Sequence, residues 1–501
     1  MNDTKTPHFK QFFDIVRMLA PIAQSIKNAG GVVYLVGGCV RDVVMGRELK
    51  DLDIEVHKLS LDALERTLAH HGTVMLVGKK FGVLRIAGYD IDWSLPRTDS
   101  KGRKPSVEIN PAMTIEQACR RRDVTMNAMA INLNDVLESQ NDIMNKLAQH
   151  DADVARVLGV IDPYGGLDDI AHKRLRAVDE ILFLEDPLRF YRVMQFIGRF
   201  DMTPDERLAA ICRTMKLYDD ATHAPLSCER IHEEMKKLLL RSNSPSKGFR
   251  WLAELGRLQE LFPELHALIG VPQPVNFHPE GDVFEHTMQS LDASARLPYY
   301  TDQPHMTATE EKLMVMLSLL CHDLGKPIVI DDQMHFYCHE EVGAILAKKL
   351  LKKLTANKTM IEAVCKMVRH HLQPFTFLDQ GAKQAAYKRL ALKLSPEVTM
   401  RQLGLLSLAD HQGTNPNGHE PLTEKAHELY HQFLAVAEQA TVAHGPEAPV
   451  LLGRHLRDVV SPGPEMGKLL KEAYRIQVEE GLKDLEALKR RVLKLRDDKL
   501  A

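Results

Sequence analysis

The sequence has few of the residues that cross-link a chain or anchor it in a membrane. Its 501 residues include seven cysteines, an odd number, without a Cys-x-x-Cys pair. This argues against a disulfide framework or a zinc ribbon and favours a reducing compartment. No apolar run reaches the length of a membrane span, and the first residues lack the layout of a signal peptide. The sequence therefore predicts a cytoplasmic protein without a membrane partner.

The chain also lacks an excess of charge of one sign. The formal net charge is −3, with 65 Lys and Arg against 68 Asp and Glu. Any surface for nucleic acid must therefore come from local segregation of charge. A hydrophobic content of 44% and a charged content of 27% are ordinary for a globular chain, and the length suits two to four domains. We find no internal repeat.

An acidic pair follows a diglycine turn near the amino end. An apolar strand runs into Gly37 and Gly38, a short helix carries Arg41, and a second strand presents Asp51 and Asp53. Alternate residues of a strand share a face, and two carboxylates ~4 Å apart repel by roughly 4 kcal/mol. A proton or a divalent cation must offset this repulsion. Diglycine backbone and a helix start also suit phosphate, so the pattern predicts Mg²⁺-dependent nucleotidyl transfer.

The surrounding periodicity predicts a small α+β head. We expect an amphipathic helix over 1–30, a helix over 61–71 and short strands over 73–77, 83–86 and 89–95. The last strand carries Asp90 and Asp92 on one face. Asp92 is our choice for a third carboxylate beside Asp51 and Asp53, and Asp90 is its solvated neighbour. Residues 99–105 are polar and predict a loop at the edge of the site.

Two charged segments follow the head strands. Arg122 and Asp123 end an arginine run and precede an apolar segment, 124–131, for which we predict a helix. Arg122 could then reach a triphosphate, while Asp123 caps the helix or binds a ribose. This segment, like the second one described next, could also be an ordinary charged face exposed to solvent.

The second charged segment opens a helix after a turn-rich hinge at 162–169. Arg189 and Arg192 lie three residues apart and share a helical face beside Asp186. Together they supply hydrogen-bond donors and acceptors at a fixed spacing. A protein needs such groups to recognise a base edge without a nucleic-acid template.

In this order the segments resemble the class II nucleotidyltransferases, which comprise the tRNA CCA-adding enzymes and bacterial poly(A) polymerases. The motifs are L-V-G-G-C-V-R-D, K-D-L-D, D-W-S-L-P-R-T, R-R-D-V-T-M-N-A, D-P-Y-G-G-L-D-D and E-D-P-L-R-F-Y-R, within about residues 31–265. The resemblance implies a polymerase-β-like head over 1–160, a helical neck over 161–270 and two Mg²⁺ ions. Asp51 and Asp53 resemble the metal-binding pair and Asp92 the third catalytic carboxylate.

The resemblance also implies a nucleotide site. Gly38, Arg41 and Arg122 resemble triphosphate contacts. Asp186 and Arg189 resemble the amino-acid template for CTP or ATP, with Arg192 beside them. Residues 226–265 place basic side chains among apolar ones, a candidate surface for tRNA or simply a solvated helix face. The strand end at 54–58 is more charged than expected of this family.

A second constellation begins after the proline-rich segment 272–279. His286 lies on a predicted helix, and an apolar helix over 313–320 leads to His322 and Asp323. His339, the pair His370 and His371, and Asp410 follow along the chain. Adjacent buried His and Asp need partners, and a metal supplies one for both. Nitrogen and oxygen ligands without thiolate suit Mn²⁺, Ni²⁺, Fe or Mg²⁺ better than structural zinc.

This ordered set resembles the HD phosphohydrolase family over about residues 275–415, and we expect the HD domain to span 271–415. The resemblance implies that His286, His322, Asp323 and Asp410 are metal ligands, with Mg²⁺, Mn²⁺ or Ni²⁺ as the ion. His339 and one of His370 or His371, for which we take His371, could hold a second ion. That would permit a two-metal phosphoesterase, whereas without them a one-metal site or a weak phosphatase follows. Residues 416–501 predict a helical tail whose end, 482–499, is basic on one face.

Three functions remain open from the sequence. The first is CCA addition to tRNA from CTP and ATP, with a phosphatase or phosphodiesterase activity in the HD domain. The second is a poly(A) polymerase or A-adding enzyme of the same class. The third is an RNA-binding protein with an inactive head whose chemistry is HD hydrolysis alone. A monomer and a homodimer are both compatible with the sequence.

Overall fold

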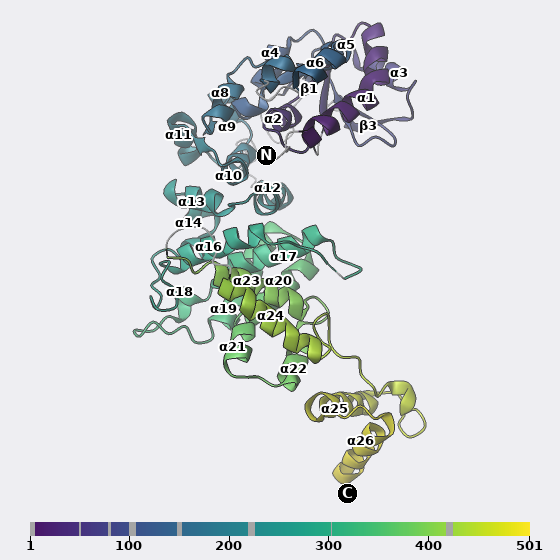
Figure 1. Cartoon of the computed structure of the whole chain (residues 1–501), viewed down its shortest axis with the longest axis vertical. Coiled ribbons are helices and arrows are strands. Elements are labelled where there is room, and N and C mark those ends of the chain that lie inside the picture. Colours follow the sequence, from purple (N-terminus) through teal and green to yellow (C-terminus); the bar gives the residue numbers. More distant parts are fainter. Residues whose placement is uncertain are drawn as a thin grey trace. The chain divides into compact units, whose positions relative to one another are not determined.

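The structure is a computed structural model that describes residues 6–49, 52–78, 82–99, 107–147, 153–218, 226–301, 303–416 and 424–500. It forms two compact units, Met1–Ile231 and His232–Ala501, whose boundary lies inside α12 (Cys228–Arg241) (Figure 1). The predicted class, an α+β head followed by mostly helical parts, is confirmed. The four-part division at residues 160, 270 and 415 stays a prediction.

A six-stranded sheet organises the head. Its order is β3 (Val74–Gly78), β4 (Val83–Ile86), β5 (Asp92–Ser94), β2 (Asp53–His57), β1 (Val32–Val36) and β8 (Ala130–Asn132). β2 and β5 run parallel, and the other neighbouring strands are antiparallel. The parallel pair places Asp53 directly opposite Asp92.

Helices cover this sheet with apolar stripes. The amphipathic helix predicted near the amino end is α1 (Thr6–Asn28), which packs on β1 and on α5 (Leu133–Glu138). Its residues Phe12, Val16 and Leu19 are fully buried. The other head helices are α2 (Gly38–Val44), α3 (Leu61–Leu68), α4 (Ile115–Arg120) and α6 (Gln140–Leu147).

The helix predicted over 124–131 is wrong. A 3₁₀ turn, Thr125–Asn127, leads directly into β8, which pairs with β1. Val124 bridges Ala177, and Ala130 bridges Ile161, so this apolar run is enclosed on several sides. A short apolar run cannot by itself distinguish a buried strand from a buried helix.

Other boundaries differ less. The predicted strand over 89–95 is only β5, and Asp90 precedes it in exposed chain. Asp99 ends β6 (Arg97–Asp99), which pairs with β7 (Val107–Ile109), while the rest of the predicted loop, 100–105, lies outside the described residues. The head unit continues through α7 (Val154–Val157), α8 (Gly166–Ala171), β9 (Arg174–Leu175), α9 (Glu180–Leu184), α10 (Leu188–Phe200), β10 (Thr203–Pro204) and α11 (Glu206–Thr214).

The second unit is helical among its described residues. It contains α13 (Ser246–Glu254), α14 (Leu258–Leu261), α15 (Pro263–His266), α16 (Val283–Arg296), α17 (Ala308–Cys321), α18 (Lys326–Val329), α19 (His339–Leu354), α20 (Lys358–His370), α21 (Gln373–Asp379), α22 (Gln384–Leu394), α23 (Met400–Gln412) and α24 (Glu424–Gln439). α16, α20 and α23 surround α17, which is why the segment 313–320 is apolar on every side.

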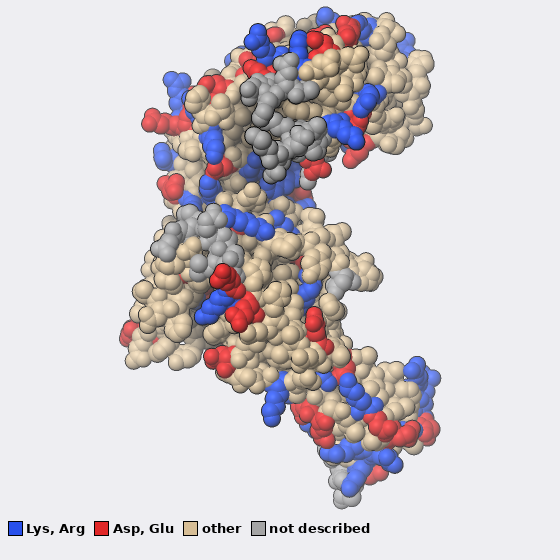
Figure 2. Space-filling view, in the orientation of Figure 1, with Lys and Arg blue, Asp and Glu red and all other residues tan. Residues whose placement is uncertain are grey.

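The chain ends in α25 (Pro464–Glu480) and α26 (Leu485–Leu500), which share a small core of their own. Basic side chains on this tail alternate with acidic ones, as Figure 2 shows. Lys489 pairs with Asp458, and Arg491 pairs with Glu480. None of the described helices is both long enough and apolar enough to cross a membrane.

Candidate active sites

The head brings together two of the three predicted carboxylates. Asp53 and Asp92 face each other across the parallel strands, and about half of each side chain is exposed. Arg85 donates to Asp92 Oδ1 from Nε at 2.9 Å and from Nη2 at 2.6 Å. Asp90 is almost fully exposed, as expected for a solvated neighbour. Asp51 lies outside the described residues.

The diglycine turn packs against a predicted triphosphate residue. Gly37 has φ +74°, and a Cβ there would lie 2.4 Å from Nη1 of Arg122. The same Nη1 lies 3.9 Å from Asp53 Oδ2. Gly38 then begins α2. The turn, Arg122 and the carboxylate Asp53 therefore form one local arrangement, and it depends on a glycine at position 37.

Arg41, in contrast, is buried and already paired. Its Nε donates to Asp42 Oδ1 at 2.9 Å and its Nη1 donates to Asn127 Oδ1 at 2.6 Å. Its guanidinium also stacks on Phe200 at 4.4 Å. These contacts attach α2 to the 3₁₀ turn and to α10, and the triphosphate role of Arg41 stays a prediction.

Four consecutive residues link the metal-site strand to the predicted template helix. Arg120 pairs with Asp179 and Arg121 with Glu55. Arg122 faces Asp53, and Asp123 accepts from Arg192 Nε at 2.5 Å. Asp123 also accepts from Asn127 and from the Val124 amide. Burial would raise the pKa of Asp123, but Arg192 and these hydrogen bonds hold it well below its ordinary range.

The predicted template residues gather at the start of α10. Arg189 donates to two main-chain carbonyls, from Nη1 to Leu182 at 3.0 Å and from Nη2 to Arg121 at 2.6 Å. Burial lowers its pKa below the ordinary arginine value. Asp186 accepts from the Leu188 amide at 3.1 Å, and its second oxygen lies 3.5 Å from Arg230. Arg189 is therefore held in one fixed orientation.

A buried acid beside the head site was not predicted. Glu55 accepts from His57 Nε2 at 2.9 Å and from Arg121 Nη2 at 3.2 Å. Burial alone would raise its pKa, but His57 and the charges of Arg121 and Arg122 lower it to about 2. The signal in the sequence was the charged strand end at 54–58.

The second unit gathers every predicted HD residue in one cluster. His286 lies in the first turn of α16, and His322 and Asp323 directly follow α17. His339 begins α19, His371 directly follows α20, and Asp410 lies in α23. The four histidines and Asp323 are buried. His370 belongs to none of the three groups of possible ligands among the described residues, so the geometry favours His371.

Two of the three groups of possible ligands among the described residues consist of predicted HD residues, and a third joins His278 and Glu280 to His286. The first contains His286, His322 and Asp410, and the second contains Asp323, His339 and His371. In the first, the two Nε2 atoms lie 3.3 Å apart. In the second, the two Nε2 atoms also lie 3.3 Å apart. Asp323 joins the groups, with Oδ2 at 3.3 Å from His322 Nε2 and Oδ1 at 3.4 Å from His339 Nε2.

Hydrogen bonding prepares these rings for a cation. His322, His339 and His371 each donate Nδ1–H to a main-chain carbonyl three residues earlier, at 2.7–2.8 Å. In a neutral ring the inward Nε2 then carries a lone pair. Burial and the charge of His339 lower the pKa of His371 to about 3, so this ring is neutral at physiological pH. When both rings are neutral, the Nε2 lone pairs of His339 and His371 face each other at 3.3 Å, an arrangement that a cation between them would stabilise.

The acidic residues lead to the same conclusion. Among the described residues, Lys326 Nζ forms an ion pair with Asp323 Oδ2 at 2.7 Å, and neither Asp323 oxygen accepts a hydrogen bond of regular geometry. Burial would raise the pKa of Asp323, but His322 and Lys326 hold it well below its ordinary range. A buried, ionised carboxylate is costly unless a cation compensates it. The nitrogen and oxygen donors therefore fit one or two divalent metal ions.

His286 differs from the other three rings. Its Nδ1 donates to Glu280 Oε1 at 2.7 Å, and its Nε2 lies 2.8 Å from Asp410 Oδ1. Burial opposes a positive charge there, but Asp410 and Glu280 raise the pKa of His286 to about 9. A metal ion at Nε2 would take the place of a proton. Glu280 was missed because it directly follows the proline-rich segment 272–279, where the sequence predicted only the start of a new domain.

Three family models match the chain. The Poly A polymerase head domain matches residues 33–176, and the HD domain matches 283–411. A model described as the probable RNA and SrmB-binding site of polymerase A matches 224–269. Head and HD matches in one chain define a nucleotidyltransferase that also carries an HD domain. Both families are metal-dependent.

Curated relatives narrow this class. The multifunctional CCA protein of Pasteurella multocida strain Pm70 is 31% identical over 427 residues, 82% of this chain and 92% of the relative. That of Neisseria meningitidis serogroup A is 31% identical over 423 residues, 82% of this chain and 88% of the relative. The chain belongs to the multifunctional CCA protein family.

Solved structures agree on the fold. The Thermotoga maritima CCA-adding enzyme complexed with tRNA matches with a TM-score of 0.56 at 18% identity, covering 96% of this chain and 95% of that one. A CCA-adding enzyme in complex with CTP matches with a TM-score of 0.59, also at 18% identity, covering 96% and 95%.

Proposed function

We propose that this enzyme adds CCA to tRNA 3′ ends from CTP and ATP without a nucleic-acid template, and that its HD cluster is a second, phosphohydrolase site. The observation that carries the first activity is the Asp53–Asp92 register with Arg122 beside it. Family membership supports the substrate assignment, since the relatives are named multifunctional CCA proteins. The compartment we propose is the cytoplasm, and the oligomeric state is a monomer or a homodimer.

In the head, Asp51, Asp53 and Asp92 would hold two Mg²⁺ ions. Bound Mg²⁺ supplies charge neutralisation at the triphosphate and a lower pKa for the attacking 3′-hydroxyl. Arg122, with Gly38 and Arg41, would position the triphosphate. The half-exposed Asp53 and Asp92 remain accessible to a nucleotide. Positioning is the main contribution of the protein, because phosphoryl transfer needs little covalent help.

Nucleotide choice would rest on the start of α10. Asp186 and Arg189 offer an acceptor and donors, while Arg192 and Asp123 fix the adjoining segment. The two carbonyl contacts hold the Arg189 guanidinium in one orientation, which a template of fixed shape requires. A base with the wrong edge would leave buried donors unpaired and be rejected.

In the HD domain, His286, His322, Asp323 and Asp410 would hold one metal ion, and His339 and His371 with Asp323 a second. Mg²⁺, Mn²⁺ and Ni²⁺ suit these donors. Such ions polarise a phosphoester and supply a hydroxide nucleophile. A 2′-phosphate or a 2′,3′-cyclic phosphate at an RNA end is the substrate we propose.

An incorporation assay tests both activities. Purified protein receives Mg²⁺, labelled CTP or ATP, and tRNA that lacks its 3′ end. We expect ordered addition of C, C and A, which Asp53→Ala abolishes while hydrolysis persists, and Asp323→Ala should give the reverse. A-tailing of general RNA would identify a poly(A) polymerase instead, and no incorporation would identify an inactive head. Loss of both activities in either variant would contradict two separate sites.

A further inference from the structure

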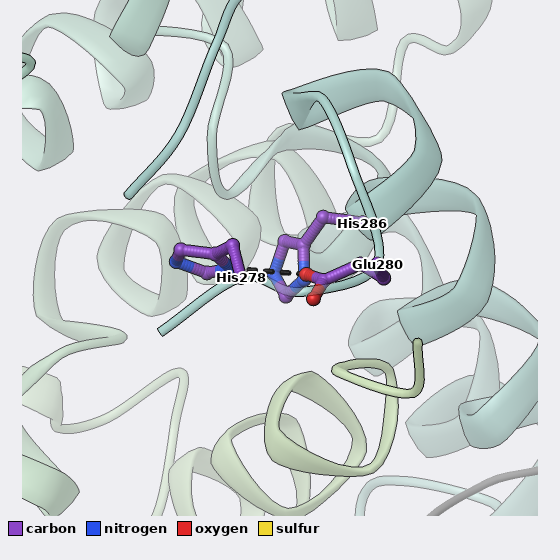
Figure 3. Close-up of side chains that lie close together, drawn as sticks. All are labelled: His278, Glu280 and His286. Carbon is purple, nitrogen blue, oxygen red and sulfur yellow. Dashed lines mark hydrogen bonds and ion pairs between the residues drawn. The ribbon is translucent and has the colours of Figure 1, made fainter. Parts of the chain in front are cut away.

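A histidine–glutamate pair outside the HD family match contacts the cluster from one side. His278 and Glu280 precede residue 283, where the match begins. The Glu280 side chain is fully buried, and its Oε1 accepts from His286 Nδ1 at 2.7 Å and from His278 Nδ1 at 3.0 Å. Figure 3 shows the three side chains together, with the Glu280 carboxylate against the His286 ring. We propose that Glu280 is a positioning residue that orients His286 toward the HD metal, and that His278 holds Glu280 in place.

The proposal rests on the HD metal site proposed above and explains why His286 needs special support. Each of the other three rings donates Nδ1–H to the carbonyl three residues earlier. For His286 that carbonyl belongs to Val283, the first residue of α16. The Val283 carbonyl oxygen already accepts a hydrogen bond from Thr287 Oγ1 at 2.8 Å. Glu280 supplies the missing acceptor from outside the helix.

The segment that carries Glu280 is itself anchored. Asp282 caps α16 by accepting from the Glu285 amide at 2.8 Å, and its other oxygen accepts from the Gly270 amide at 2.6 Å. The Val283 amide donates to the Val271 carbonyl at 3.1 Å. A fixed segment places the Glu280 carboxylate reproducibly at His286.

The acceptor is also different in kind. Glu280 is a carboxylate, whereas the other three rings donate to neutral carbonyls. A charged acceptor forms the stronger hydrogen bond and makes the ring a better electron donor to a metal. It also fixes which nitrogen of His286 carries the hydrogen, so that Nε2 faces His322 and Asp410. The His278 ring packs edge-on against the His286 ring, with centroids 4.7 Å apart, which restricts its tilt.

Metal binding by full-length Glu280→Gln tests the proposal. The amide has the same shape but no charge, and its NH₂ group can face Nδ1 and favour hydrogen on Nε2. Measured by Mn²⁺ titration, the affinity of one ion should fall about 10–100-fold without a change in the number of ions. With Co²⁺ in place of Mn²⁺, the visible absorption bands should shift. His278→Gln should change both measurements in the same direction by less.

Glu285→Gln is the matched control, because Glu285 precedes His286 but pairs with Arg250 instead. It should keep the wild-type Mn²⁺ affinity and Co²⁺ spectrum. All variants should retain CTP incorporation, which reports an intact head. Wild-type affinity and spectrum in Glu280→Gln would overturn the proposal, and loss of one whole ion would make Glu280 a direct ligand. If wild-type protein binds no metal and hydrolyses nothing, the HD function fails rather than this inference.

Discussion

At the scale of single residues, the two sites balance acidic charge differently. Asp53 and Asp92 in the head are about half exposed, so water can solvate them, and Arg122 and Arg85 lie beside them. Asp323 in the second unit is buried and depends on neighbouring positive charge. The head thus resembles an open site for an arriving nucleotide and metal, and the HD cluster resembles a resident metal site.

Gly37 gives a prediction at this scale. Gly37→Ala must strain a positive φ and place a methyl group against Arg122, so nucleotide incorporation should fall at least about tenfold, the equivalent of about 1.4 kcal/mol. Gly46→Ala is the control, because Gly46 also has a positive φ (+63°) but nothing within 4 Å of its added Cβ. Steady-state CTP incorporation measures both variants. Equal loss in the two would mean that backbone strain alone, and not Arg122, matters.

Glu55 gives a pH prediction. Its pKa is lower in the folded head, about 2, than the ordinary 4.5, so ionised Glu55 stabilises the head above pH 4.5. That contribution, about 3 kcal/mol, is lost as the pH falls from 4.5 toward 2. The difference in unfolding free energy between the parent and Glu55→Gln should therefore shrink over this interval. Fluorescence of Trp93 in a Trp251→Phe background reports unfolding of the head. A free-energy difference between the two proteins that does not change with pH would contradict the lowered pKa of Glu55.

At the scale of elements, the segment 120–123 connects strand β2 to helices α9 and α10. The sequence predicts nucleotide-binding roles for Arg122, Arg189 and Arg192, and these roles stay predictions. It did not predict that Arg189 binds the Arg121 carbonyl or that Arg121 binds Glu55. Such contacts join residues far apart in the chain, and spacing along one helix carries no information about them.

The HD cluster also combines residues that the sequence predicted with one that it did not. The six candidate ligands of the HD domain could be named from the sequence because histidine and aspartate in that order have few other uses, and the structure brings all six together. Glu280 could not be predicted, because a glutamate beside a proline-rich segment carries no functional signal in the sequence. Only the fold shows that it contacts His286. The helix over 124–131 failed because periodicity cannot distinguish enclosed strands from enclosed helices.

Arg189 gives the prediction for α10. Arg189→Lys keeps the charge, but one ammonium cannot reproduce the planar fork that contacts two carbonyls. The ratio of CTP to UTP incorporation, and of ATP to GTP, should fall about tenfold or more, whereas turnover with CTP should fall less. Arg207→Lys on α11, where the side chain is 84% exposed, is the control and should change neither. Unchanged selectivity in Arg189→Lys would refute the template role.

At the scale of the whole molecule, each compact unit carries one proposed site and one tryptophan. Trp93 lies buried in β5 of the head, and Trp251 lies in α13 of the second unit. α13 packs on α16, the helix that carries His286. Single-tryptophan proteins, made by Trp93→Phe or Trp251→Phe, therefore report the two units separately in the intact chain.

Metal removal should lower the unfolding temperature reported by Trp251 more than that reported by Trp93. The HD cluster buries acidic side chains and imidazoles that a metal cation would stabilise, whereas the head carboxylates are exposed to water. A metal at 100 times its Kd stabilises the folded state by about 2.7 kcal/mol, so EDTA should lower the Trp251 transition by roughly 5–10 °C. The Trp93 transition should stay in place. Added Mn²⁺ should restore the Trp251 transition temperature. In Asp323→Asn, EDTA should no longer change that temperature. Equal shifts at both tryptophans would mean that the HD cluster is not the stabilising metal site.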